Sequence, residues 1–247
     1  MPNKQNQLVP IFNELHAIDY NLDKNLPELL NKSSAKRTLN AWVEGTVVDG
    51  KGQVWIIENF LASIWRTDLS TANFFIDRVP SNDKINFDNK MCIKYSSVIY
   101  RLNEIIQSPT SHKRREYLRV SEDIGRAVRD STPVEVIRLR YYEFVEETKK
   151  KLKHQRIKQY KIEIDELTNQ PLDVASSEFH HIRRQSSSYD MIGFIWNGLI
   201  INKDTHDIIT AHNISDEYDL KELCLERDWA MDWFERYEED LRVMLCK

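Results

Sequence analysis

The segment from residue 178 to residue 212 constrains the fold of this chain most strongly, because clustered histidines coincide in it with an ordered series of local structure signals. Four of the seven histidines of the chain lie there: His180, His181, His206 and His212. Strand-forming residues flank the doublet, an Asn-Gly pair follows at 197–198, and an apolar run of buried-strand type begins at Leu199. Helical spacing follows, with Asp204 or Thr205 as the expected N-cap. The segment therefore predicts a strand, a second strand and a helix.

The spacing of His180-His181, Asn197 and His206 within these elements resembles the HNH motif of the ββα-metal nuclease superfamily. The resemblance implies an α+β chain with a C-terminal ββα-metal (HNH) nuclease domain. Phosphodiester hydrolysis needs a nucleophilic water and positive charge beside the phosphate, and the family supplies these with one divalent ion and one histidine. The lead-in at residues 166–179 is similar to that of many members, but it lacks the cysteine pairs that bind zinc in them. Ordinary packing must then hold the domain together.

The resemblance assigns a role to each motif residue. It implies that His180 and His206 are metal ligands and that His181 is the general base that takes a proton from water. It also implies that Asn197 orients the His181 ring by bonding its other nitrogen, which fixes the tautomer. The cofactor implied is one divalent metal ion, Mg²⁺ in the first place, with Mn²⁺, Zn²⁺ or Ni²⁺ as alternatives.

Two further residues are candidates for the metal site. Some family members carry another histidine four residues after the last motif histidine, where this chain has Thr210. His212 lies six residues after His206 and therefore on a different helix face, so it is a weaker candidate. Glu178, at the start of the expected strand, is the other additional candidate. A site with two protein ligands, completed by water and phosphate, is also common in the family.

Simpler interpretations compete with each motif residue taken alone. A single histidine is usually a surface or hydrogen-bonded residue, and an Asn-Gly pair by itself indicates only a hairpin turn. Neighbouring strand residues point to opposite faces, so both rings of the doublet can serve one site only where the strand end is distorted. The agreement of three positions in type and spacing favours the nuclease interpretation.

Composition and charge are those of an ordinary globular protein. The 247 residues suffice for one large or two small domains, with 41% apolar and 30% charged residues. The sequence contains neither a long apolar run nor the apolar core of a signal peptide at its N-terminus, so a cytoplasmic protein without membrane association is expected. Three distant cysteines, Cys92, Cys224 and Cys246, suggest neither a disulfide framework nor a zinc site.

Three regions are expected along the chain. Residues 1–132 form a mostly helical recognition region, residues 133–163 a long basic helix or linker, and residues 164–247 the catalytic domain with its closing helices. Within the first region the expected features are short helices over 8–31 broken near Pro27, a hairpin of 46–48 with 53–57, a loop over 80–90 and a helix over 96–107. A helix over 54–65 is the alternative to the second strand of the hairpin.

Basic residues cluster in spite of a formal net charge of −4. Neutralised phosphates release counterions, so a basic stripe on a nearly neutral protein suffices for binding double-stranded DNA. A solvated helix face is the competing interpretation. The residues expected to contact DNA are Arg114, Arg115, Arg119, Lys153, Arg156, Arg183 and Arg184.

The sequence therefore predicts a metal-dependent DNA endonuclease that cleaves both strands at a specific sequence, as restriction enzymes do. Nicking, homing and structure-selective nucleases are alternatives within the enzymes. A non-catalytic DNA-binding regulator on an HNH scaffold is the alternative of another class, against which the intact His181 and His206 argue. Because one HNH site cuts one strand, a homodimer is expected on DNA. Trp229, Trp233 and Tyr237 are the candidate contact, and burial within their own subunit is the alternative.

Overall fold

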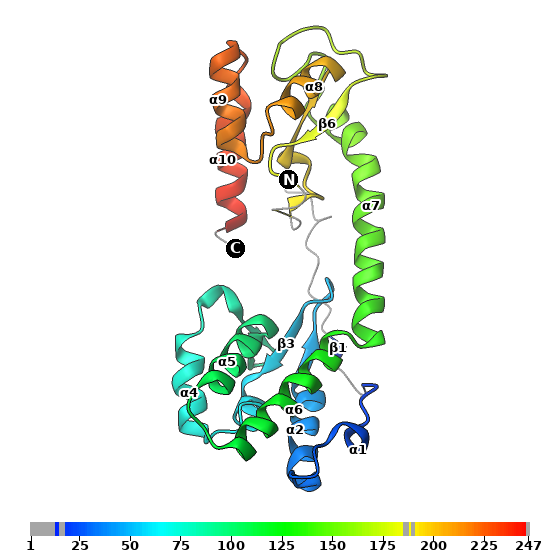
Figure 1. The fold of residues 1–247 in the computed structure, drawn as a ribbon. Helices are drawn as coiled ribbons and strands as arrows, with labels where there is room; N and C mark the ends of the chain where they lie inside the picture. The colour runs from blue at the N-terminus through cyan, green and yellow to red at the C-terminus, as the bar shows by residue number, and fades with distance from the viewer. Residues whose placement is uncertain (1–12, 15–17, 185–187, 189–190, 246–247) are drawn as a thin grey trace. The chain divides into compact units, whose positions relative to one another are not determined.

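The computed structural model describes residues 13–14, 18–184, 188 and 191–245. The chain forms two compact units, residues 1–141 and residues 142–247, whose boundary lies inside the long helix α7 (Thr132–Tyr160). Figure 1 shows the course of the chain and its elements. Helices and small antiparallel sheets occur in both units, so the predicted α+β class is confirmed.

The first unit contains a five-stranded antiparallel sheet in the order β1-β2-β3-β5-β4. Its strands are β1 (Asn13–Glu14), β2 (Thr46–Val48), β3 (Val54–Ile57), β4 (Lys84–Phe87) and β5 (Lys90–Lys94). The predicted hairpin is β2 with β3, and Asp49 holds its turn by accepting hydrogen bonds from the backbone N–H groups of Lys51 and Gln53. The alternative helix exists only after β3, as η1 (Glu58–Phe60) and α3 (Leu61–Ile64).

The loop predicted over residues 80–90 is wrong. This stretch forms η2 (Ser81–Asp83), the strand β4 and a tight turn into β5. Asp88 and Asn89 both have positive φ angles, 48° and 57°, as a two-residue hairpin turn of the primed type requires. Asp and Asn tolerate this conformation, and the polar residues that suggested a loop therefore make a hairpin.

The helices of the first unit pack on one another and against the sheet. They are α1 (Leu22–Asn25), α2 (Lys32–Gly45), α3, α4 (Leu69–Arg78), α5 (Tyr95–Gln107), α6 (His112–Arg129) and the start of α7. The predicted helix over 96–107 is confirmed as α5. Of the helices predicted over 8–31, α1 is described, and residues 1–12 and 15–17 lie outside the described residues.

Alternating side chains of β3 divide the core of the first unit. Val54 and Ile56 join the main core beneath the helices, whereas Trp55 and Ile57 belong to a smaller cluster on the other face of the sheet. Trp42 is fully buried, and its indole N–H donates to Ser121 Oγ at 2.9 Å. Trp42 therefore belongs to the core of this unit.

The second unit contains the predicted strand, strand and helix in the predicted order. Its elements after α7 are β6 (Glu178–His181), η4 (Ile195–Asn197), β7 (Gly198–Ile201), α8 (Lys203–Ala211), α9 (Glu217–Arg227) and α10 (Asp232–Leu245). β6 pairs with β7 in antiparallel fashion, and α8 packs against β6 (Figure 1). Asn202 occupies the N-cap of α8, so the expected caps Asp204 and Thr205 lie within the helix.

The apolar residues of α10 close the core of the second unit. Trp233 and Tyr237 are each only 2% exposed and pack with residues such as Leu199 and Ile201 of β7. The stripe expected to make a dimer contact is thus used within its own unit, because the two-stranded sheet needs an apolar cover. None of the described helices combines the length and the apolar character needed to cross a bilayer.

Candidate functional site

The register of β6 decides where the histidine doublet points. His180 pairs with Leu199 and His181 with Gly198, and side chains alternate along the strand. The ring centroid of His180 lies 5.4 Å from that of His206 on α8. The ring of His181 instead packs edge-on against Phe179, with their centroids 4.9 Å apart. The strand therefore presents the two rings on opposite faces, and only His180 faces the helix.

His180 is half-buried, and its ring is more enclosed than that of His181. Its Nε2 atom is enclosed and has no hydrogen-bond partner among the described residues. Burial, together with the smaller effect of positive charge on His206, His181 and Arg184, lowers the pKa of His180 to about 3. The ring is consequently neutral at neutral pH, which is the protonation state of a metal ligand.

His206 completes the contact from the first turn of α8. Its Nδ1 atom lies 3.2 Å from Oε2 of Glu178, which shares the face of β6 with His180. A carboxylate at this distance favours a proton on Nδ1 and leaves the lone pair on Nε2. Metal-binding histidines are commonly oriented by such a carboxylate. The structure thus places Glu178 as the partner of His206.

His181 is held by the loop between the two strands. Its Nε2 atom lies 3.1 Å from the carbonyl oxygen of Ile192. A carbonyl oxygen can only accept, so the proton of the neutral ring is on Nε2 and the basic lone pair is on Nδ1. Burial lowers the pKa of His181 more than the bond to Ile192 raises it, and the charge of Lys149 adds to the lowering. The ring is therefore a neutral base with a fixed tautomer.

Asn197 does not orient His181 as the sequence suggested. It is fully buried, its Nδ2 donates to the carbonyl oxygen of Met191 at 3.1 Å, and its Oδ1 accepts from the backbone N–H of Arg183 at 3.2 Å. These bonds tie the segment after β6 to the segment before β7. The Ile192 carbonyl, and not Asn197, orients the His181 ring. Asn197 acts one step away, because it holds the loop that carries this carbonyl.

The glycine of the Asn-Gly pair serves close packing. Gly198 has an extended φ of −163° and begins β7, so the pair is not the central turn of a hairpin. A Cβ atom at this position would lie 2.2 Å from the Phe179 ring. Glycine therefore allows Phe179 to lie across β7, where its ring also contacts His181.

Asp165 positions the helix that carries His206, and the sequence interpretation missed it. Its carboxylate is fully buried and accepts hydrogen bonds from the backbone N–H of Asn202 at 2.8 Å and from Thr205 Oγ1 at 2.7 Å. Its other oxygen accepts from the N–H groups of Leu167 and Thr168. Asn202 makes no side-chain cap of its own, so Asp165 holds the N-terminus of α8 from outside the helix.

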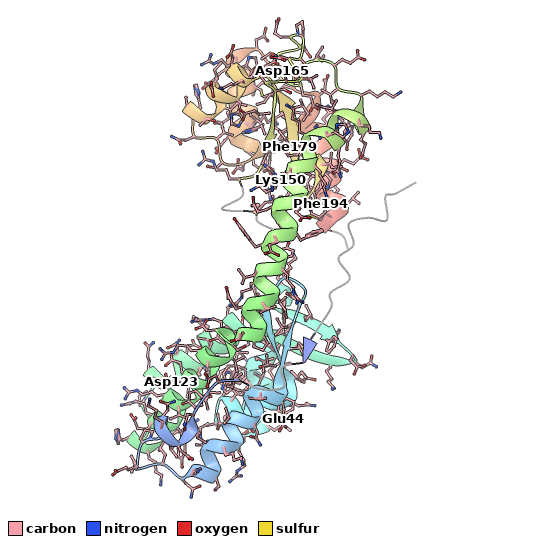
Figure 2. The ribbon with its side chains drawn as sticks, turned by 90° about the vertical axis from the view of Figure 1, so that its right-hand side faces the viewer. Glu44, Asp123, Lys150, Asp165, Phe179 and Phe194 are labelled. Carbon is pink, nitrogen blue, oxygen red and sulfur yellow. The ribbon has the colours of Figure 1, made fainter. Side chains whose placement is uncertain are left out.

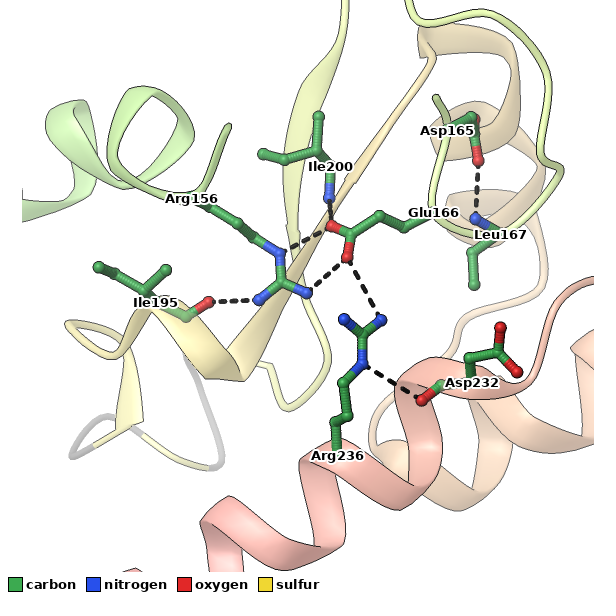
Figure 3. A network of polar contacts seen from close by, with 8 residues as sticks. All are labelled: Arg156, Asp165, Glu166, Leu167, Ile195, Ile200, Asp232 and Arg236. Carbon is green, nitrogen blue, oxygen red and sulfur yellow. Dashed lines mark hydrogen bonds and ion pairs between the residues drawn. The ribbon is translucent and has the colours of Figure 1, made fainter. Parts of the chain in front are cut away.

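Glu166 holds β7 in a similar way (Figure 3). Its carboxylate accepts two hydrogen bonds of 2.7 Å from the guanidinium of Arg156 and one of 2.7 Å from the backbone N–H of Ile200. Arg156 also donates to the carbonyl oxygen of Ile195 at 2.9 Å, and Arg236 of α10 approaches the same carboxylate at 3.9 Å. In the sequence this network is marked by a polar turn around residues 165–171. That signal could not have revealed the network, because it does not show that the acids are buried.

Three of the residues expected to contact DNA are engaged inside the second unit. Arg156 is 5% exposed and paired with Glu166. Lys153 Nζ donates to two backbone carbonyl oxygens, those of Val174 and Ser177, at 2.7 and 2.6 Å. Arg183 pairs through two nitrogens with the buried Glu217. Arg156 and Arg183 pair with buried carboxylates, and Lys153 donates to backbone carbonyls, so all three already have partners within the second unit.

The remaining basic candidates lie closer to solvent. Arg184 is exposed and donates to the carbonyl oxygen of Ile214. Arg114 and Arg119 are exposed on α6 of the first unit, where Arg119 pairs with Glu116 at 2.7 Å. Arg115 is half-buried on the same helix. These four residues could still contact DNA. Arg156 and Arg183 could not do so without giving up their ion pairs within the second unit.

His212 lies away from the His180–His206 contact. It is exposed at the C-terminal end of α8, where its Nδ1 lies 2.8 Å from the carbonyl oxygen of Ile208. A histidine in this position caps free carbonyl groups of the helix end. The structure therefore gives His212 a capping role, and it is not brought to the candidate site.

The donors of the site fit a divalent ion in their chemistry. Two imidazoles face each other across β6 and α8, one with a buried nitrogen that lacks a partner among the described residues and the other oriented by a carboxylate. No set of three or more His, Cys, Asp or Glu side chains converges to hold a metal among the residues that the structure describes. The arrangement fits a site with two protein ligands, His180 and His206.

Comparison of the chain with protein-family models, with curated proteins and with solved structures found no match.

Proposed function

We propose that this protein is a metal-dependent DNA endonuclease of the HNH type. The observation that carries the proposal is the second unit's strand–strand–helix element, in which the rings of His180 and His206 meet while the next residue of the strand, His181, is held neutral on the opposite face. Burial of a nitrogen that lacks a partner is costly, and a ligand at His180 Nε2 would remove this cost. Restriction-type cleavage of both strands is the finer form of the proposal.

The chain's own residues account for the proton transfer. His181 has its free lone pair on Nδ1, because Nε2 bonds to the Ile192 carbonyl. In the proposed reaction Nδ1 takes a proton from the attacking water while the water oxygen forms a bond to phosphorus. The bond from phosphorus to the 3′ oxygen breaks, and this oxygen takes a proton from solvent. The products are a 5′-phosphate and a 3′-hydroxyl.

His180 and His206 would hold the divalent ion, with Glu178 orienting the His206 ring. A bound ion supplies positive charge beside the phosphate and the leaving oxygen. Asp165 fixes α8 and therefore the height of His206 above β6, and Asn197 fixes the loop that presents the Ile192 carbonyl to His181. The site thus depends on buried polar residues that touch neither the substrate nor the ion.

The test is cleavage of duplex DNA by the purified full-length protein in magnesium, with EDTA as a second condition. His181→Ala should lower the cleavage rate by about a hundredfold or more while DNA binding stays close to that of the unchanged protein. His212→Ala is the matched control, since this histidine lies in the same unit, at the C-terminal end of α8, and only caps that helix. EDTA should stop the reaction.

Cleavage by His181→Ala at the rate of the unchanged protein would exclude His181 as the base. Absence of cleavage by the unchanged protein with every divalent ion tried, together with firm DNA binding, would favour the non-catalytic regulator. A reaction that stops at the nicked circle would favour the nicking alternative over restriction.

A further inference from the structure

The first unit contains a cavity of about 630 Å³ whose lining is basic. Its charged lining residues are Arg37 of α2, Arg66 after α3, and Lys113 and Arg114 in the first turn of α6. Among the residues that the structure describes, no Asp or Glu lines it. The remaining lining is mainly hydroxyl-bearing, with Ser34 and Thr38 among these residues. The cavity therefore brings together four positive charges without a negative one.

Arg66 is fixed in the wall of this cavity. Its guanidinium donates to Thr38 Oγ1 and Ser34 Oγ, both at 2.9 Å, and its carbon lies 4.0 Å from the centroid of the Tyr117 ring. Burial lowers the pKa of Arg66, and the charges of Arg37 and Arg114 lower it further. The guanidinium is thus held by neutral groups close to other cations.

The backbone at Arg66 has a conformation that arginine rarely adopts. Its φ is 50°, in the left-handed region that glycine and asparagine favour. Such a conformation costs about 1–3 kcal/mol and persists where the surroundings enforce it, most often at functional positions. Glycine would adopt this backbone conformation more easily than arginine does. The presence of arginine is explained if its guanidinium is needed in the cavity.

The first turn of α6 points to the same ligand. It carries Lys113 and Arg114 and has no acidic residue, although the positive end of a helix favours acidic residues. Arg37 and Lys113 are exposed and form no ion pair with a described residue. An anion in the cavity would relieve the repulsion among these cations and would face the N-terminus of α6.

We propose that this cavity binds a phosphate group, carried by a nucleic-acid strand end or by a free nucleotide or polyphosphate. Guanidinium and ammonium groups, hydroxyls and a helix N-terminus are the groups that bind phosphate oxygens. The four cations exceed what one singly charged carboxylate would neutralise, which favours a dianionic or polyanionic ligand. The proposal does not rest on the nuclease function, because every lining residue belongs to the first unit.

The experiment is calorimetric titration of the full-length protein with sodium pyrophosphate, in EDTA so that DNA probes stay intact. Arg37→Ala and Lys113→Ala should each weaken pyrophosphate binding about tenfold, as expected for the loss of one charge-assisted hydrogen bond. Lys36→Ala is the matched control: it removes one positive charge from the same helix, but Lys36 does not line the cavity. It should change the affinity by less than about twofold.

The source of the phosphate is distinguished by competition. A duplex with 5′-phosphates that displaces pyrophosphate, while the same duplex without them does not, would support the proposal and identify a strand end. Pyrophosphate binding that neither duplex displaces would support it and identify a free nucleotide or polyphosphate. Failure of the unchanged protein to bind pyrophosphate at millimolar concentration, or an equal loss in Lys36→Ala, would overturn it.

Discussion

His180 and His206 are the residues whose meeting turns a histidine-rich segment into a candidate site. Their rings lie 5.4 Å apart although they come from a strand and from a helix. One ring is neutral because it is buried, and the other has a carboxylate beside Nδ1. The His180 ring therefore has a nitrogen lone pair to offer a divalent ion at neutral pH.

At the scale of the residue, we predict that both histidines are needed for metal binding. His180→Ala and His206→Ala should each abolish Mn²⁺ binding measured by calorimetry in the absence of DNA. Each substitution would leave the ion with a single protein ligand, which does not hold it. Glu178→Gln should weaken binding by about tenfold or more, since it disturbs only the orientation of the His206 ring.

The control for the metal prediction is His212→Ala, which removes a histidine from the end of the same helix without touching the site. Mn²⁺ binding that is unchanged in His206→Ala would show that the ligand assignment is wrong.

The elements around the site are joined by buried polar contacts. Glu166 accepts from the backbone of β7 and from Arg156 of α7, and Asp165 holds the N-terminus of α8. These two adjacent acids thus connect the strand and the helix of the candidate site to the rest of the second unit. Figure 2 shows Asp165 and Phe179 in this unit. The unit needs such contacts because its sheet has only two strands.

At the scale of the element, we predict that Arg156→Ala destabilises the fold. It would leave Glu166 as a buried charge without its main partner, and the free energy of unfolding should fall by about 3–5 kcal/mol. Urea unfolding followed by circular dichroism measures this loss. Lys158→Ala, which removes an exposed charge from the same helix, is the control and should change the free energy by less than about 0.5 kcal/mol.

The outcome separates the two interpretations of Arg156. If it were a DNA-contact residue, as its place in a basic run suggested, Arg156→Ala would weaken DNA binding and leave the stability unchanged.

The whole molecule consists of two units with separate chemical character. The second holds the histidine site, and the first holds the basic cavity. In the proposed nuclease reaction one histidine site would act on one strand at a time, and the strands of a duplex run in opposite directions. Double-strand cleavage therefore calls for two copies of the chain related by a two-fold axis.

At the scale of the whole molecule, we predict that the protein dimerises on duplex DNA and converts supercoiled plasmid to the linear form. Light scattering with and without DNA measures the mass, and gel analysis of the plasmid measures the product. Trp233→Ala should lower the stability of the monomer, because Trp233 is buried in its own unit and does not form the dimer contact. A protein that stays monomeric on DNA and yields only nicked circles would contradict the dimer.

The sequence by itself determined the local elements of the second unit. Strand-forming residues around the histidine doublet, the apolar run after Gly198 and the helical spacing beyond it predicted β6, β7 and α8 correctly. These signals are local, since they depend on backbone preference and on the alternation of apolar side chains. The hairpin of β2 with β3 followed from the same kind of signal.

The tertiary structure alone decided which polar side chains are buried. Arg156 and Arg183 look like surface cations in the sequence, but they pair with Glu166 and Glu217 inside the fold. Asn197 binds the loop that presents the Ile192 carbonyl, and the strand sends His181 to the face opposite His180. The cations of the basic cavity likewise come from three separate segments of the sequence, at Arg37, Arg66 and Lys113–Arg114. Burial and pairing depend on which distant segments meet, and no local pattern records this.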